Sequence, residues 1–140
     1  MKKSLTILML IVVIIGCKSE KEGKKTEKLN IQKQSEMAFL MNKMYEENEK
    51  VKKKILKGAD LLDFPEEYLK IHTATLTDPS DRTPEFRAFS ELYLSNLRVV
   101  FETSKDSLKY KFNETVNSCI ACHQTTCVGP IPRIKKLLIK

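Results

Sequence analysis

The chain has 140 residues, of which 31% are charged and 41% hydrophobic, and this composition indicates one modest globular domain rather than a disordered chain. With 4 glycines and 5 prolines, it has too few turn formers for a β-sandwich or β-barrel, and it contains no glycine-rich phosphate-binding loop. The formal net charge is +7, part of which lies in an N-terminal segment that we expect to be removed.

Residues 1–16 are typical of a bacterial export signal. Lys2 and Lys3 form a basic start, and the apolar run 5–15 is too short to span a bilayer as a mature helix. The run ends in Ile-Ile-Gly-Cys at 14–17, which resembles the lipobox of lipoproteins, where the cysteine is acylated and becomes the mature N-terminus. An ordinary secretory signal is the alternative. We therefore expect Cys17 to carry a membrane anchor on the extracytoplasmic side, at the periplasmic face or the cell surface.

Residues 17–34 are predicted to form a flexible linker, because they are rich in Lys, Glu, Ser and Gly and show no apolar periodicity. Glutamates are interleaved with the lysines, so we expect these lysines to keep the linker soluble rather than to attract it to anionic lipids. The mature chain keeps 23 basic and 18 acidic residues, a net charge of +5. Residues 35–140 are left as the folded domain.

A first helix is predicted from Ser35, a favoured capping residue, to Lys57, which precedes Gly58. A short second helix over 65–72, a loop over 78–81, a third helix over 83–103, a fourth over 107–124 and an apolar segment over 134–139 follow. Four helices with short links and no convincing strand predict an all-α, antiparallel four-helix bundle. The inward stripe of the first helix consists of Met37, Met41, Met44, Asn48, Val51 and Ile55.

The fourth predicted helix carries the motif C-x-x-C-H at Cys119, Cys122 and His123. Positions i, i+3 and i+4 share one face of a helix. Two thiols on adjacent turns can form thioethers with the two vinyl groups of one porphyrin, and the next imidazole can bind the iron as the proximal ligand. The motif therefore predicts one covalently attached haem c. The export signal agrees with this prediction, because haem c is generally attached outside the cytoplasm, where free thiol pairs would otherwise oxidise.

Two other readings of the motif stay open. Cys119 and Cys122 could form a redox dithiol, although the sequence has no thioredoxin-like βαβ pattern. With His123 and Cys127 they could also form a Cys₃His zinc site, although zinc sites normally draw their ligands from two separated pieces of chain. Cys127 itself can be free, packed, or paired with a second copy in a homodimer.

The lipobox, the four predicted helices and the single C-x-x-C-H on the last helix together resemble the cytochrome c prime group over residues 35–125. This resemblance implies a helical bundle that holds one haem c near the C-terminus, with the first helix packed over the distal face. The chain differs from that group in its longer tail, 127–140, and in the extra thiol of Cys127.

The resemblance also points to a distal iron ligand. Alignment on the glycine that ends the first helix places Met41 near the distal position, and His/Met coordination raises the reduction potential. A methionine stripe is more often core packing, and Met37, Met44 and His72 are alternative ligands. If none of them binds, the iron is five-coordinate and open to NO or CO.

These features predict a monohaem c-type cytochrome that carries single electrons and whose positive charge favours acidic redox partner proteins. A five-coordinate haem protein that binds NO or CO is the alternative. We expect no enzyme, since no Ser–His–Asp set is available, and no nucleic-acid partner for an exported lipoprotein. Arg133 and Lys135 follow the motif closely and are candidates to neutralise a haem propionate, or are plain surface charges.

Overall fold

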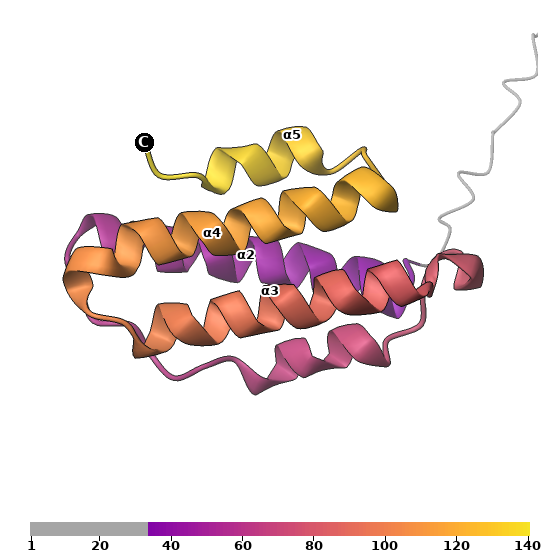
Figure 1. Cartoon of the computed structure of the whole chain (residues 1–140), viewed down its shortest axis with the longest axis horizontal. Coiled ribbons are helices and arrows are strands. Elements are labelled where there is room, and N and C mark those ends of the chain that lie inside the picture. The colour runs from indigo at the N-terminus through magenta and orange to yellow at the C-terminus, as the bar shows by residue number, and fades with distance from the viewer. Residues whose placement is uncertain (1–33) are drawn as a thin grey trace, which may run out of the picture. The chain divides into compact units, whose positions relative to one another are not determined.

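The computed structural model describes residues 34–140, and this part of the chain is helical and contains no strand. Three long α-helices dominate it: α2 (Glu36–Leu56), α3 (Pro84–Glu102) and α4 (Lys105–Thr125) (Figure 1). The shorter helical segments are η2 (Glu66–His72), η3 (Pro79–Asp81), α5 (Ile131–Ile134) and η4 (Lys135–Leu137).

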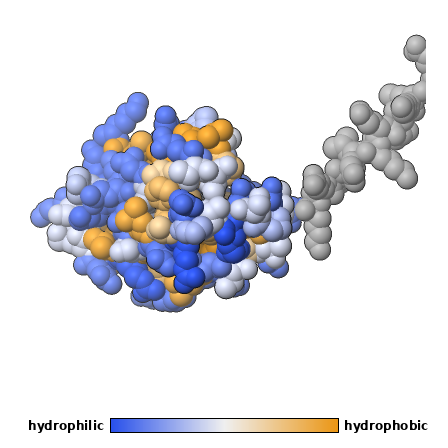
Figure 2. Space-filling model, turned by 45° about the vertical axis from the view of Figure 1, so that its right-hand side comes forward, coloured by the Kyte–Doolittle hydropathy of each residue, from blue (hydrophilic) through white to orange (hydrophobic). Residues whose placement is uncertain are grey.

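Successive segments α2, η2, α3 and α4 run in alternating directions, and α5 returns along α4 (Figure 1). Apolar and hydrophilic side chains are interspersed on the surface seen in Figure 2. Within residues 34–140, none of the helices combines the length and apolarity that a membrane crossing requires. The predicted signal, Cys17 and nearly all of the predicted linker lie outside the described residues.

The helix ends follow local capping signals. The side-chain oxygens of Ser35 and Thr83 each accept a hydrogen bond, at 3.1 Å, from the backbone N–H three residues later. Gly58 ends the first helix with a φ of 65°, a left-handed conformation that glycine adopts without steric cost. These features confirm the predicted first and third helices. The fourth predicted helix is α4, which begins at Lys105, two residues before the predicted start at Ser107.

The second predicted helix is a 3-10 helix rather than an α-helix. Pro65 precedes it without a side-chain cap, and the chain leaves the helix at Thr73. The guanidinium of Arg82 donates hydrogen bonds to the carbonyl oxygens of His72 and Ala74, which fixes the turn that follows. The described part of the chain therefore has three long α-helices, with a seven-residue 3-10 helix in the second position.

Two clusters of buried apolar side chains form the core, and the half-buried side chain of Cys119 packs against both. The first core cluster combines residues of α2, η2 and α3 with Ala74, which lies between η2 and α3. It consists of Met37, Leu40, Met44, Tyr68, Ile71, Ala74, Phe86, Tyr93, Leu94 and Leu97. The second core cluster, from α3, α4 and the C-terminal segment, consists of Val100, Leu108, Phe112, Val116, Ile134, Leu137 and Ile139.

The apolar segment at the end of the sequence is a packed part of the domain. Ile134, Leu137 and Ile139 are buried, and each such side chain contributes about 1.5–3 kcal/mol when fully removed from water. The side chain of Asn113 both donates to the carbonyl oxygen of Ile139 and accepts from its N–H, at 2.9 Å in each case. The segment therefore closes the second core cluster on the side of α4.

A buried tyrosine hydroxyl gives a test of this packing. Tyr68 is buried, and its hydroxyl has no hydrogen-bond partner among residues 34–140, whereas the hydroxyl of Tyr93 accepts a bond from Asn48 Nδ2 at 3.3 Å. An unsatisfied buried hydroxyl costs about 1–3 kcal/mol. We expect Tyr68→Phe to leave the free energy of unfolding unchanged or raise it by about 1 kcal/mol, and Tyr93→Phe to lower it by about 1 kcal/mol. Urea denaturation followed by circular dichroism measures both, and a marked destabilisation by Tyr68→Phe would contradict the structure.

Candidate functional site

The three residues of the C-x-x-C-H motif lie in the last two turns of α4. Because α4 stays α-helical to Thr125, Cys119, Cys122 and His123 keep the i, i+3, i+4 relation that brings side chains to one face. All three side chains are half-buried. Both thiol side chains pack against the first core cluster, so the motif lies at the boundary between that core and the surface.

The imidazole of His123 is held by the loop that follows α4. Its Nδ1 lies 2.9 Å from the carbonyl oxygen of Cys127 and 3.3 Å from the Sγ of the same residue. Since a carbonyl oxygen only accepts, a hydrogen bond between these two atoms requires the ring proton on Nδ1, which leaves the lone pair on Nε2. Metal-binding histidines are typically oriented in this way, by a backbone carbonyl or carboxylate on the other ring nitrogen.

The cysteines of the site are neutral thiols at physiological pH. Burial raises the pKa of Cys119 to about 12, and burial also raises the pKa of Cys122 and of Cys127. The hydroxyls of Thr125 and Thr126 both donate to the carbonyl oxygen of Cys122 at 2.8 Å, which closes the end of the helix. Reactive redox dithiols depend on a lowered thiol pKa. This environment raises the pKa instead, so it favours the protonated thiol over the reactive thiolate.

The three methionines of α2 differ in burial. Met37 and Met44 are buried members of the first core cluster. Met41 is half-buried and packs against that cluster from its edge, as Cys119 and Cys122 do. α4 contacts α2 much less extensively than it contacts α3. Met41 is therefore the α2 methionine whose thioether is least enclosed by the core.

The other predicted candidates make contacts outside the motif. His72 is half-buried, and its Nδ1 lies 3.3 Å from the Oγ of Ser90, so its ring faces α3. Arg133 donates to the Oδ1 of Asn42 at 2.7 Å, and its guanidinium lies 3.9 Å from the ring centroid of Tyr45. Arg133 thus fastens α5 to α2, and neither contact involves a residue of the C-x-x-C-H motif.

Sequence reasoning missed the contribution of the Cys127 backbone, because it considered only the thiol of this residue, as an extra cysteine or as a zinc ligand. The one available signal was the Gly129-Pro130 pair, which predicts a turn soon after α4. Among residues 34–140, no group of three or more His, Cys, Asp or Glu side chains is arranged to hold a metal ion, so the Cys₃His set is not preformed.

The chain matches no family model, no curated protein and no solved structure.

Proposed function

We propose that this chain is a lipid-anchored, extracytoplasmic c-type cytochrome that carries single electrons and has one covalently attached haem c. The observation that carries the proposal is the hydrogen bond from His123 to the Cys127 carbonyl, combined with the helical spacing of Cys119 and Cys122. These residues fit the group: the two thiols would hold the porphyrin by thioethers, and His123 Nε2 would be the proximal ligand. When bound, haem c supplies one-electron Fe(III)/Fe(II) chemistry.

The protein's own residues tune such a site in two ways. The first core cluster lies against Cys119 and Cys122 and excludes water from that side, which lowers the local dielectric. The Cys127 carbonyl fixes the ring of His123 and increases its strength as a ligand.

The domain is proposed to be a variant four-helix haem c bundle in which η2 replaces the second α-helix, and Met41 is proposed as the distal ligand.

A five-coordinate haem protein that binds NO or CO is the alternative, and one observation favours it. The α2 methionines pack against the first core cluster, as methionines that serve only as core residues do. If all three methionines keep this role and His72 keeps its contact with Ser90, the iron has no sixth protein ligand, and a small diatomic ligand can take that position.

The reduced-minus-oxidised visible spectrum, recorded with and without CO, tests the proposal. For an electron carrier with two axial protein ligands, we expect a low-spin haem spectrum that CO does not change. A ferrous spectrum that shifts on addition of CO would favour the alternative. A protein matured in a host that attaches haem c, but lacking any Soret band, would contradict both readings.

The proposed anchor has its own test. We expect Cys17→Ala to abolish acylation, so that the protein leaves the membrane fraction or keeps its signal peptide. Cell fractionation and intact mass measure this. Cys127→Ala is the matched control, because it also removes one thiol but leaves the Ile-Ile-Gly-Cys sequence unchanged. A Cys17→Ala protein that is processed and fractionates as the wild type does would refute the lipobox assignment.

A further inference from the structure

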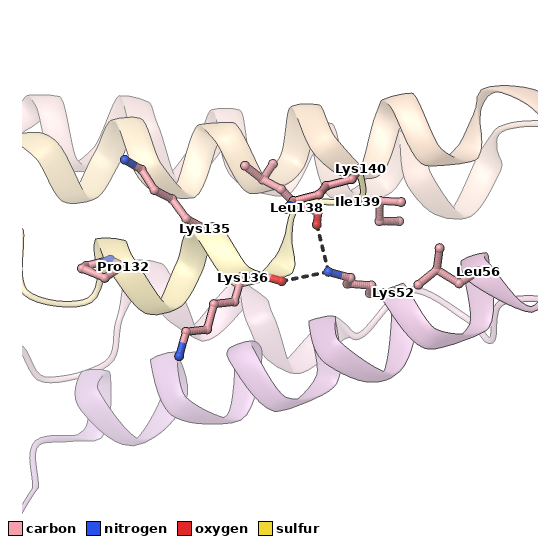
Figure 3. Close-up of a pocket in the computed structure, with 8 residues that line it drawn as sticks. All are labelled: Lys52, Leu56, Pro132, Lys135, Lys136, Leu138, Ile139 and Lys140. Carbon is pink, nitrogen blue, oxygen red and sulfur yellow. Dashed lines mark hydrogen bonds between the residues drawn. The ribbon is translucent and has the colours of Figure 1, made fainter.

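A basic groove lies between the C-terminal half of α2 and the segment that runs from α5 to residue 140 (Figure 3). It is an open groove with a volume of about 640 Å³. Leu56, Pro132 and Leu138 provide apolar lining. No acidic side chain lines it. The basic lining consists of Lys52, Lys135, Lys136 and Lys140.

The walls of this groove are fixed by hydrogen bonds. The ammonium of Lys52 donates to the carbonyl oxygens of Lys136 and Leu138, at 2.8 Å each, as Figure 3 shows. Asn113 holds the backbone of Ile139 by two further bonds from α4. The backbone walls of the groove are therefore already formed, so that only the exposed lysine side chains have to be ordered by a ligand.

Three lysines of the groove have no acidic partner. Lys135, Lys136 and Lys140 are exposed, and none of them forms an ion pair within residues 34–140. Lys135 and Lys136 extend in different directions from the backbone segment (Figure 3). Their uncompensated charge creates a positive potential, and Leu56, which is 61% exposed, adds apolar surface beside it. Lys135, a candidate propionate partner by sequence, also lines this groove.

We propose that the groove binds the headgroup of an anionic phospholipid, with the phosphate at the lysines and the glycerol and upper acyl carbons on the apolar lining. The combination of positive charge with an apolar lining fits an amphiphile, which carries an anionic and an apolar group in one small molecule. The choice of a lipid rests on the proposed function in one respect, because an anchor at Cys17 keeps the domain beside a bilayer.

Hydrogen–deuterium exchange of the full-length, haem-loaded protein in neutral detergent tests this proposal. The probe is dihexanoyl phosphatidylglycerol, and dihexanoyl phosphatidylcholine is the uncharged counterpart. We expect the phosphatidylglycerol to protect backbone amides in 52–56 and 131–140, and the phosphatidylcholine to protect them much less. Replacement of Lys135, Lys136 and Lys140 by Gln should weaken the phosphatidylglycerol affinity by about tenfold or more.

A matched variant controls for net charge. Replacement of Lys50, Lys54 and Lys70 by Gln removes the same charge outside the groove, and it should change the affinity by less than about twofold. Equal weakening by both triple variants, equal binding of the two lipids, or equal binding of glycerol 3-phosphate or an acidic peptide would overturn the proposal. The exchange of these two segments reports neither haem attachment nor acylation, so its failure is distinguishable from failure of the proposed function.

Discussion

Replacement of both Cys119 and Cys122 by serine is expected to abolish covalent attachment of haem to this protein. A thioether requires the cysteine sulfur, and the serine hydroxyl does not replace it. Serine is close in size to cysteine, and both positions are half-buried, so the helical fold should persist. The measurement is a haem stain after denaturing electrophoresis of protein made in a host with haem c maturation. A double variant that keeps its stain would end the haem c hypothesis.

Two related variants sharpen this result. Either single serine variant leaves one thiol, and we expect a weaker but retained stain from a single thioether. Cys127→Ser is the matched control: it removes the third described thiol but keeps the backbone carbonyl that accepts from His123. It should therefore stain as the wild type does. If Cys127→Ser instead abolished the stain, Cys127 would be an attachment residue and the C-x-x-C-H assignment would be wrong.

Met41→Ala is expected to open the iron to CO and to lower the reduction potential, while covalent haem and helical content are retained. A thioether ligand stabilises ferrous iron, so its loss favours the ferric state. Truncation of a fully buried methionine costs about 2–5 kcal/mol, and the half-buried Met41 should cost less. Loss of stability alone does not identify a ligand, so the CO-dependent spectrum and the potential are the decisive measurements.

The neighbouring methionines provide the controls. Met37 and Met44 are 6% and 5% exposed, so their alanine variants should lose more stability than Met41→Ala while the iron coordination stays unchanged. A changed spectrum in Met37→Ala, Met44→Ala or His72→Ala, with none in Met41→Ala, would transfer the ligand role. No change in any of the four would favour five-coordinate iron, and NO or CO binding would then be the better-supported function.

Sequence patterns predicted the parts of the fold that depend on neighbouring residues. Ser35, Gly58 and Thr83 act within one helical turn, so their capping roles are visible in the sequence. The 3-10 form of η2 was not predicted, because it depends on packing: Tyr68 and Ile71, three residues apart, are its two buried side chains. This spacing matches the three residues per turn of a 3-10 helix.

The candidate site was predictable only in part, for similar reasons. C-x-x-C-H is a local motif, and its residues share a helix as expected. The stacking of Arg133 on Tyr45 joins residues far apart in the chain, and no periodicity indicates such a pair. The half-burial of Met41 beside two buried methionines also depends on how α2 packs, since all three positions follow the same apolar stripe.

The shorter of the two contacts of His123 Nδ1, at 2.9 Å, is to a main-chain atom, and this has an evolutionary consequence. Any side chain at position 127 that preserves the turn also preserves the carbonyl that orients the ring. Selection that preserves the orientation of the His123 ring therefore acts on the number of residues between His123 and α5 rather than on the identity of residue 127. Among homologues that share this architecture, we expect position 127 to vary freely, and insertions or deletions between 123 and 131 to be rare.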